Sequence, residues 1–342
     1  MTKQVTLSIN GITVTVPDGT LVADAAKMAG IDIPVFCHHP KLEPVGMCRM
    51  CLVEIGRPML DRATGQVVIE NGQPKIQFMP KLETACTNRV SEGMVVMTVS
   101  DKATDGQKGT VEFLLTSHPL DCPVCDQAGE CHLQDLSYEN GKAASRYEFE
   151  RRTFEPVDIG DSIKLHMNRC ILCYRCVKVA DQLTDGRVHG VINRGDVSEI
   201  STYISQAVEN DMSGNMIDVC PVGALTDRTF RFSSRVWFTN PVDAHRECGT
   251  CAGKAVLWLK GNEVLRVTGR KDQWGEVEDF ICNTCRFDKK DLNAWKVEGP
   301  RKIDRHSVIG QGQYMLQRKQ QLLNAPAPNV PEIAKRKELK DR

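Results

Sequence analysis

The sequence predicts an α+β protein that is assembled from several small metal-binding modules. Two observations predict this: the chain of 342 residues contains 15 cysteines, and short alternating strand patterns separate the cysteine groups. Most of the cysteines form C-x2-C pairs, a spacing typical of metal ligands. An odd number of cysteines also disfavours a closed disulfide framework, so we expect a reducing compartment.

The first module begins with a predicted β-hairpin and a helix. Apolar and polar residues alternate over residues 4–10 and again over residues 12–16, and Asn10-Gly11 between them is a strong signal for a two-residue hairpin turn. Residues 21–28 have helical character and end before Gly30. Two strands and a helix therefore lead directly into the first cysteines.

The first cysteine group has the pattern C-x10-C-x2-C, followed by a remote cysteine after a polar, hairpin-like insertion over residues 57–80. It resembles a plant-type [2Fe–2S] ferredoxin, which implies a β-grasp domain over residues 1–100. The alternative is a zinc site with four cysteines. His38 and His39 are expected at the cluster rim or the surface. The predicted ligands are Cys37, Cys48, Cys51 and Cys86.

The second group combines one histidine with three cysteines in the pattern H-x3-C-x2-C-x5-C. Its residues are His118, Cys122, Cys125 and Cys131. Pro123 and Gly129 would help the loop turn around a bulky cofactor, and residues 110–116 are expected to form a short helix. A zinc site with one histidine and three cysteines is the alternative.

This motif, directly downstream of a ferredoxin-like module, resembles the large iron–sulfur subunit of respiratory complex I, the NADH:quinone oxidoreductase. The resemblance implies a [4Fe–4S] cluster in a small helical domain over residues 101–145. A neutral imidazole in place of one thiolate should raise the potential of such a cluster.

The third group is a C-x2-C-x2-C run whose expected fourth cysteine, at position 180, is an alanine. A remote Cys-Pro pair supplies the missing ligand and predicts a [4Fe–4S] ferredoxin-like domain over residues 146–240. The predicted ligands are Cys170, Cys173, Cys176 and Cys220. We expect the basic neighbours Arg169, Arg175 and Lys178 to lie on a solvated face; the alternative is that they moderate the charge of the cluster.

The last four cysteines form two C-x2-C pairs: Cys248, Cys251, Cys282 and Cys285. Many members of the family hold a further [4Fe–4S] cluster here, in a subdomain related to molybdopterin oxidoreductases, but Ala255 occupies the third-ligand position. Strand-like residues 255–260 and 263–267 predict a small β-rich domain over residues 241–295. We favour zinc over a third [4Fe–4S] cluster, and unligated thiols are a third possibility.

The residues after this domain predict a basic interaction tail over residues 296–342, in which Lys and Arg outnumber Asp and Glu by 11 to 5. A helix is expected over residues 307–323, and a solvated tail without a partner is the alternative. Only 57 residues follow Cys285, so we expect a short form that lacks the molybdopterin-type domain.

The resemblance covers about residues 1–290 and implies an electron-relay subunit of a NADH:quinone oxidoreductase (translocase) that binds no substrate and has no catalytic residues. No nucleotide-binding loop is present, because the one G-x-G fragment, Gly310 and Gly312, lacks a third glycine. The implied partners are a flavin-bearing NADH-oxidising subunit and the other peripheral-arm and membrane subunits.

Location and alternatives follow from composition. No apolar run is long enough to span a membrane and no signal or transit peptide is evident, so we expect a peripheral subunit on the cytoplasmic side of the inner (plasma) membrane. Equal totals of 44 basic and 44 acidic residues argue against nucleic-acid binding.

Two other functions are the alternatives to a complex I subunit. One is the iron–sulfur subunit of a soluble NAD-reducing hydrogenase or NAD-dependent formate dehydrogenase. The other, more remote, is a multi-zinc structural adaptor.

Overall fold

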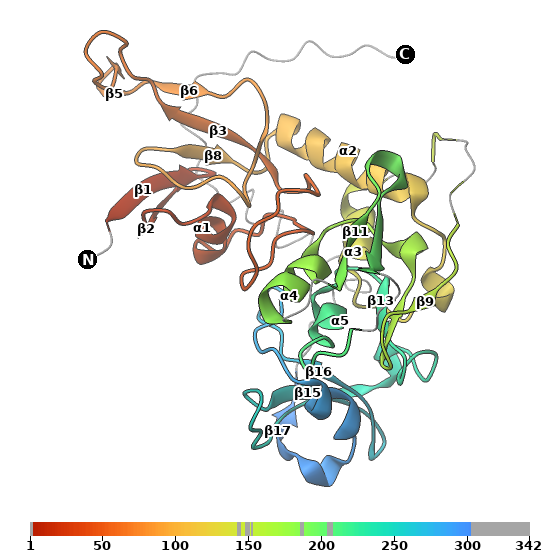
Figure 1. Ribbon diagram of the computed structural model, residues 1–342. Helices are drawn as coiled ribbons and strands as arrows, with labels where there is room; N and C mark the ends of the chain where they lie inside the picture. Colours follow the sequence, from red (N-terminus) through yellow and green to blue (C-terminus); the bar gives the residue numbers. More distant parts are fainter. Residues whose placement is uncertain are drawn as a thin grey trace. The chain divides into compact units, whose positions relative to one another are not determined.

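The computed structural model describes residues 3–141, 145–147, 151, 153–184, 188–203 and 208–301 (Figure 1). The described chain divides into two compact units, one with residues 3–33 and 52–104 and the other with residues 34–51 and 105–301. Most of the expected basic tail, with the helix predicted over residues 307–323, lies outside the described residues. Each unit is described by itself.

The first unit is a mixed sheet with one helix. The sheet has the order β2-β1-β8-β3-β6, with β7 paired to β3, and β4 and β5 form a separate small hairpin. β1 pairs antiparallel with β2 and parallel with β8. The elements are β1 (Gln4–Ile9), β2 (Ile12–Pro17), α1 (Val22–Met28), β3 (Leu52–Pro58), β4 (Ile69–Glu70), β5 (Gln73–Pro74), β6 (Ile76–Phe78), β7 (Glu83–Thr84) and β8 (Val95–Met97).

The predicted hairpin and helix at the start of this unit are confirmed. Asn10 and Gly11 have φ values of 50° and 84°, the left-handed conformation that a type I′ turn requires at both central positions. The side chains of β1 alternate, so that Val5, Leu7 and Ile9 are buried in the core. The apolar pattern of the sequence therefore sets the register of the hairpin.

The second unit contains short helices, small sheets and many irregular loops. Its first part comprises α2 (Asp101–Ser117, mostly in this unit), η1 (Cys122–Val124), α3 (His132–Asn140), β9 (Val157–Asp158), β10 (Ile163–Leu165), η2 (Met167–Arg169), α4 (Arg175–Leu183), β11 (His189–Ile192), η3 (Gly195–Val197), β12 (Glu199–Thr202), α5 (Asn215–Val219), β13 (Leu225–Asp227) and η5 (Val236–Phe238). The pairs β10–β13, β10–β9 and β11–β12 are antiparallel. The helix expected over residues 110–116 begins earlier, at Asp101.

The second part of this unit is an antiparallel sheet with the order β16-β15-β14-β17. Its elements are β14 (Asn240–His245), β15 (Lys254–Lys260), β16 (Glu263–Gly269), η6 (Thr284–Asp288), η7 (Leu292–Ala294) and β17 (Lys296–Pro300). The two strands expected between the last cysteine pairs are β15 and β16. β17 pairs with β14, so the sheet includes the first residues of the range expected to form the tail.

None of the helices among the described residues combines the length and the apolar character that a bilayer crossing requires.

Candidate metal centres

Three cysteines of the first group lie in the irregular segment 34–51 of the second unit, and Cys86 lies in the first unit just after β7. All four are buried. The thiols of Cys48 and Cys37 are hydrogen-bonded, and this contact together with burial raises the pKa of Cys48. The backbone N–H of Met50 donates to Cys48 Sγ at 3.5 Å. The two histidines after Cys37 are also buried, which contradicts a surface position for them.

The second group is held in a loop between α2 and α3. Cys125 and Cys131 are buried, whereas Cys122 is exposed. Nδ1 of His118 is buried and has no hydrogen-bond partner, and burial lowers the pKa of this imidazole to about 4. A neutral histidine with an unpartnered ring nitrogen is suited to metal ligation.

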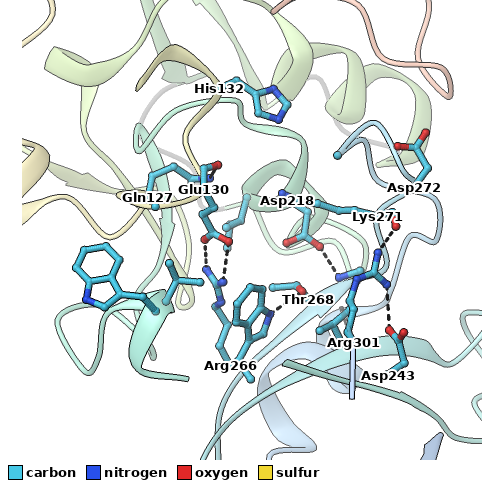
Figure 2. A pocket seen from close by; sticks show the side chains of 18 of the residues that line it. Gln127, Glu130, His132, Asp218, Asp243, Arg266, Thr268, Lys271, Asp272 and Arg301 are labelled. Atoms are coloured by element: carbon cyan, nitrogen blue, oxygen red, sulfur yellow. Dashed lines mark hydrogen bonds and ion pairs between the residues drawn. The ribbon is translucent and has the colours of Figure 1, made fainter. Parts of the chain in front are cut away.

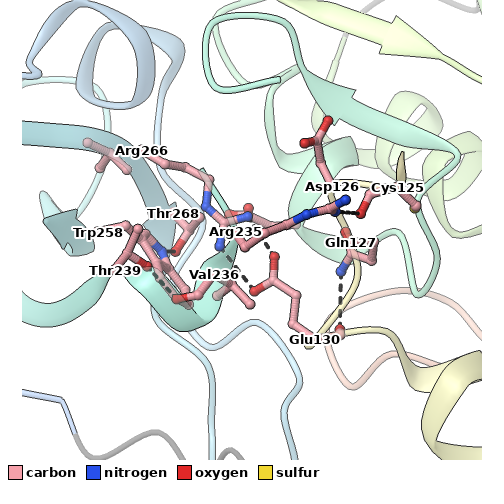
Figure 3. A network of polar contacts seen from close by, with 12 residues as sticks. Cys125, Asp126, Gln127, Glu130, Arg235, Val236, Thr239, Trp258, Arg266 and Thr268 are labelled. Carbon is pink, nitrogen blue, oxygen red and sulfur yellow. Dashed lines mark hydrogen bonds and ion pairs between the residues drawn. The ribbon is translucent and has the colours of Figure 1, made fainter. Parts of the chain in front are cut away.

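A network of polar contacts fixes this loop against the C-terminal sheet (Figure 3). Arg266 on β16 forms a bidentate ion pair with Glu130, with distances of 2.6 and 3.1 Å, and its guanidinium carbon lies 4.3 Å from the ring centre of Trp258. Arg235 donates to the carbonyl oxygen of Cys125 at 2.6 Å. Because these contacts flank two of the cysteines, they define the shape of the loop.

The third group converges on one small cavity, lined by Cys170, Cys173, Cys176 and Cys220 together with apolar side chains. Burial raises the pKa of Cys173 to about 12. The N–H of Leu172 donates to Cys170 Sγ at 3.3 Å. The cysteine run that leads into α4, and the remote cysteine after α5, therefore line the same cavity.

The second and third groups are neighbours within this unit. The N–H of His132 donates to the carbonyl oxygen of Pro221 at 3.2 Å, and Pro221 directly follows Cys220. A Cβ at Gly223 would collide with Sγ of Cys125. The loop after Cys220 thus packs directly against the second cysteine loop, and only glycine fits at this contact.

Arg175 forms a buried ion pair that the sequence did not reveal. Its guanidinium binds both carboxylate oxygens of Glu276 at 2.7 and 2.8 Å and donates to the carbonyl oxygens of Val219 and His38. Burial alone would raise the pKa of Glu276, but Arg175 holds it at about 2. Arg169 is also buried and pairs with Asp121 at 2.9 Å. The expectation that these two arginines lie on a solvated face is wrong.

Lys178 fits that expectation better, because it is partly exposed and pairs with the exposed Glu43 at 2.9 Å. The buried arginines instead place positive charge beside thiol groups. Burial raises the pKa of Cys125, and Arg169 opposes that shift. Arg175 has the same opposing effect on the pKa of Cys173.

The fourth group forms a compact cluster at the edge of the C-terminal sheet. Sγ of Cys248 lies 3.7 Å from Sγ of Cys282, and Sγ of Cys251 lies 3.7 Å from Sγ of Cys285. All four sulfur atoms lie within 4.8 Å of one another. Hydrogen bonds from the N–H groups of Thr250 and Cys251 lower the pKa of Cys248 to about 6. Two distant C-x2-C pairs therefore form one site.

A pocket of about 710 Å³ lies where the second cysteine loop, α5 and the C-terminal sheet meet (Figure 2). Several of its charged side chains are paired with one another: Glu130 with Arg266 at 2.6 Å, and Asp243 with Arg301 at 3.0 Å. Sequence reasoning missed this pocket, because its walls come from segments more than a hundred residues apart.

Three family models match the chain. They are a 2Fe-2S iron-sulfur cluster binding domain over residues 2–101, the NADH-ubiquinone oxidoreductase-G iron-sulfur binding region over residues 107–146, and the ferredoxin-like domain of NADH-quinone oxidoreductase subunit 3 over residues 160–226. The first three ligand groups fall within these ranges in order. The fourth group lies beyond them.

Curated relatives match most of the chain. A NADH-quinone oxidoreductase subunit of Rickettsia felis is 35% identical over 298 residues, and the 75 kDa subunit of NADH-ubiquinone oxidoreductase from Reclinomonas americana is 32% identical over 329 residues. The chain is a homologue of the large iron–sulfur subunit of complex I. The matches cover 86% and 96% of this chain but 40% and 44% of those relatives, so the chain spans less than half their length.

Among solved structures, a chain of the NAD+-reducing [NiFe]-hydrogenase in the H2-reduced state matches with a TM-score of 0.56 and 25% identity. This match covers 68% of the present chain and 91% of the hydrogenase chain. The present chain thus shares its fold with a chain of this hydrogenase over about two thirds of its length.

Proposed function

We propose that this chain relays electrons within a NADH:quinone oxidoreductase of the complex I type. The observation that carries the proposal is that each of the first three ligand groups falls inside a matching iron–sulfur family model, in the same order along the chain. The homology to complex I subunits over most of the chain supports the same role.

The proposed cofactors are one [2Fe–2S] cluster and two [4Fe–4S] clusters. The [2Fe–2S] cluster is assigned to Cys37, Cys48, Cys51 and Cys86. The [4Fe–4S] clusters are assigned to His118, Cys122, Cys125 and Cys131, and to Cys170, Cys173, Cys176 and Cys220. The unpartnered Nδ1 of His118 and the convergence of the third group on one cavity fit these assignments. When bound, each cluster takes up and releases one electron.

The chain's own residues would set the potentials of these sites. His118 supplies a neutral ligand where the other sites have thiolates, which makes its site less negative. Arg169 and Arg175 add positive charge, and backbone N–H groups such as that of Leu172 donate to ligand sulfurs. All three effects favour the reduced, more negative state of a nearby cluster.

The proposed assembly places this chain beside a flavin-bearing subunit that oxidises NADH. Electrons would pass from that flavin through this chain toward quinone, and the other peripheral-arm and membrane subunits would carry out quinone reduction and ion translocation. In this proposal the chain is a peripheral subunit on the cytoplasmic side of the inner (plasma) membrane.

The second candidate is the corresponding subunit of a soluble NAD-reducing hydrogenase, favoured by the structural match to the hydrogenase chain. The C-terminal sheet with its four cysteines argues for the complex I type. An alignment over 96% of this chain necessarily includes that segment, so the similarity to complex I subunits continues through it.

The test is electron transfer in the assembled complex that contains a Cys173→Ala variant. NADH:ferricyanide reduction, which needs the flavin partner alone, should persist, whereas NADH:quinone reduction should fall at least about tenfold because a relay site is lost. An Asp181→Asn variant, altered at an exposed side chain of α4, serves as the control. Undiminished quinone reduction in an assembled Cys173→Ala complex would refute the relay role.

A further inference from the structure

The spacing of the last four cysteines distinguishes a single metal ion from a cluster. In a tetrahedral zinc site with Zn–S bonds of about 2.3 Å, neighbouring sulfur atoms are about 3.8 Å apart. Two of the sulfur–sulfur distances are 3.7 Å, and each joins one C-x2-C pair to the other. The four sulfur atoms therefore have the size of a coordination shell around one ion.

A [4Fe–4S] cluster requires a wider arrangement, because each thiolate binds a different iron atom and the cluster body separates the ligands. Among the residues that the structure describes, this group alone brings three or more metal-ligating side chains close enough to share one ion. The three groups assigned to clusters are not that compact. The fourth cysteine group is thus more compact than the other three groups of the same chain.

We infer that Cys248, Cys251, Cys282 and Cys285 bind one zinc ion and that this site is structural. Four thiolates in a tetrahedral arrangement suit zinc, and thiolate sites bind Zn²⁺ more tightly than Fe²⁺. The four positions are all filled by protein sulfur, which leaves no open position for a substrate. The inference does not depend on the relay function.

Hydrogen bonds to the sulfurs offset the negative charge of four thiolates. The N–H of Thr250 donates to Cys248 Sγ at 3.5 Å and that of Gly253 donates to Cys251 Sγ at 3.4 Å. These are equivalent positions, two residues after each cysteine of the first pair. Arg246 Nη1 donates to Cys285 Sγ at 3.4 Å and brings a positive charge to the second pair.

The segment that carries the second cysteine pair also contacts α5, the helix that ends next to Cys220. Arg286 pairs with Asp218 at 2.6 Å, and both side chains are buried. Asn215 exchanges hydrogen bonds of 2.9 and 3.0 Å with the backbone of Ile281. Zinc at this site would therefore fix the loop against which α5 packs.

The test measures zinc, iron and acid-labile sulfide in the full-length chain isolated without oxygen, together with X-ray absorption at the zinc edge. We expect about one zinc per chain with four sulfur neighbours at about 2.3 Å, and about 10 iron. A Cys251→Ser/Cys285→Ser double variant should lose the zinc and keep the iron and sulfide, while Glu263→Gln, a change at an exposed side chain at the start of β16, should keep all three.

Three results would overturn the assignment, and each is read on the unmodified chain, so a misfolded variant cannot obscure them. About 14 iron with matching sulfide and no zinc would indicate a third [4Fe–4S] cluster. About 11 iron without additional sulfide and without zinc would indicate a mononuclear iron site. About 10 iron and no zinc would indicate that the last four cysteines are free thiols. An unmodified chain without the iron and sulfide of the three clusters would refute the relay proposal instead.

Discussion

At the scale of single residues, His118 is the ligand whose chemistry differs from the rest. We expect a His118→Cys variant to keep a tetranuclear cluster and to lower its potential, because a thiolate adds negative charge where the imidazole is neutral. A redox titration followed by electron paramagnetic resonance measures the shift. His132→Gln, a change next to Cys131 but outside the proposed ligand set, should shift the potential less. An unchanged or higher potential in His118→Cys would contradict the role of the imidazole.

The buried pair of Arg175 and Glu276 yields a stability prediction. Glu276→Gln leaves a buried guanidinium without its counter-charge, which should lower the free energy of unfolding by about 3 kcal/mol. Glu43→Gln, which breaks the exposed pair with Lys178, should lower the free energy of unfolding much less, because water screens that pair. Chemical denaturation at neutral pH measures both. If both substitutions lowered the free energy of unfolding equally, burial would not make the pair of Arg175 and Glu276 more important for stability than the exposed pair.

The pH dependence of this pair follows from its depressed carboxyl pKa. The ordinary pKa is 4.5 and the folded pKa is about 2, so the contribution of Glu276 is complete above about pH 4.5. It is lost as the pH falls through the folded value. Glu276→Gln should therefore flatten the acid side of the stability profile relative to the unmodified chain, which denaturation at a series of pH values measures. A profile with the same acid slope in both proteins would contradict the assignment of the pKa.

Residue-scale features also show where sequence reasoning fails. Arg169 and Arg175 lie next to cysteines, and arginine side chains are usually exposed unless they are paired. Their partners, Asp121 and Glu276, lie 48 and 101 residues away along the chain. Local sequence carries no information about such partners, so the burial of both arginines could not be predicted.

At the scale of elements, the close packing of the loop after Cys220 against Cys125 is testable. Gly223→Ala should displace the second cysteine loop, because a Cβ there meets Sγ of Cys125. We expect an altered paramagnetic resonance spectrum and faster loss of iron from the site with His118. Gly190→Ala introduces the same methyl group on β11 where no atom lies within 4 Å, and it should change neither property.

Elements with a local signal were predictable from the sequence. The hairpin at Asn10 follows from a period-two pattern and a turn signal, and the strands β15 and β16 follow from short runs of strand-forming residues. Cysteine spacing singled out the residues of each candidate site. The start of α2 at Asp101 was missed because its first turns are polar and contain Gly106 and Gly109, which lower helix propensity. β17 was missed because a strand formed by pairing with β14 depends on distant residues.

At the scale of the whole molecule, a series of proposed relay sites is followed along the chain by a proposed structural metal site. Ligand type, buried arginines and the packing of successive loops distinguish the sites from one another. The metal preference of the last site could not be read from its C-x2-C pairs, since zinc and cluster sites use the same cysteine spacing. Sulfur–sulfur distances, which the sequence does not contain, provide that distinction.

The most direct test of the relay role counts paramagnetic centres in the full-length chain, isolated without oxygen and reduced with dithionite. We expect three reducible centres, one with the relaxation behaviour of a [2Fe–2S] cluster and two with that of [4Fe–4S] clusters, each close to one spin per chain. A colourless, zinc-rich chain without such signals would contradict the relay role.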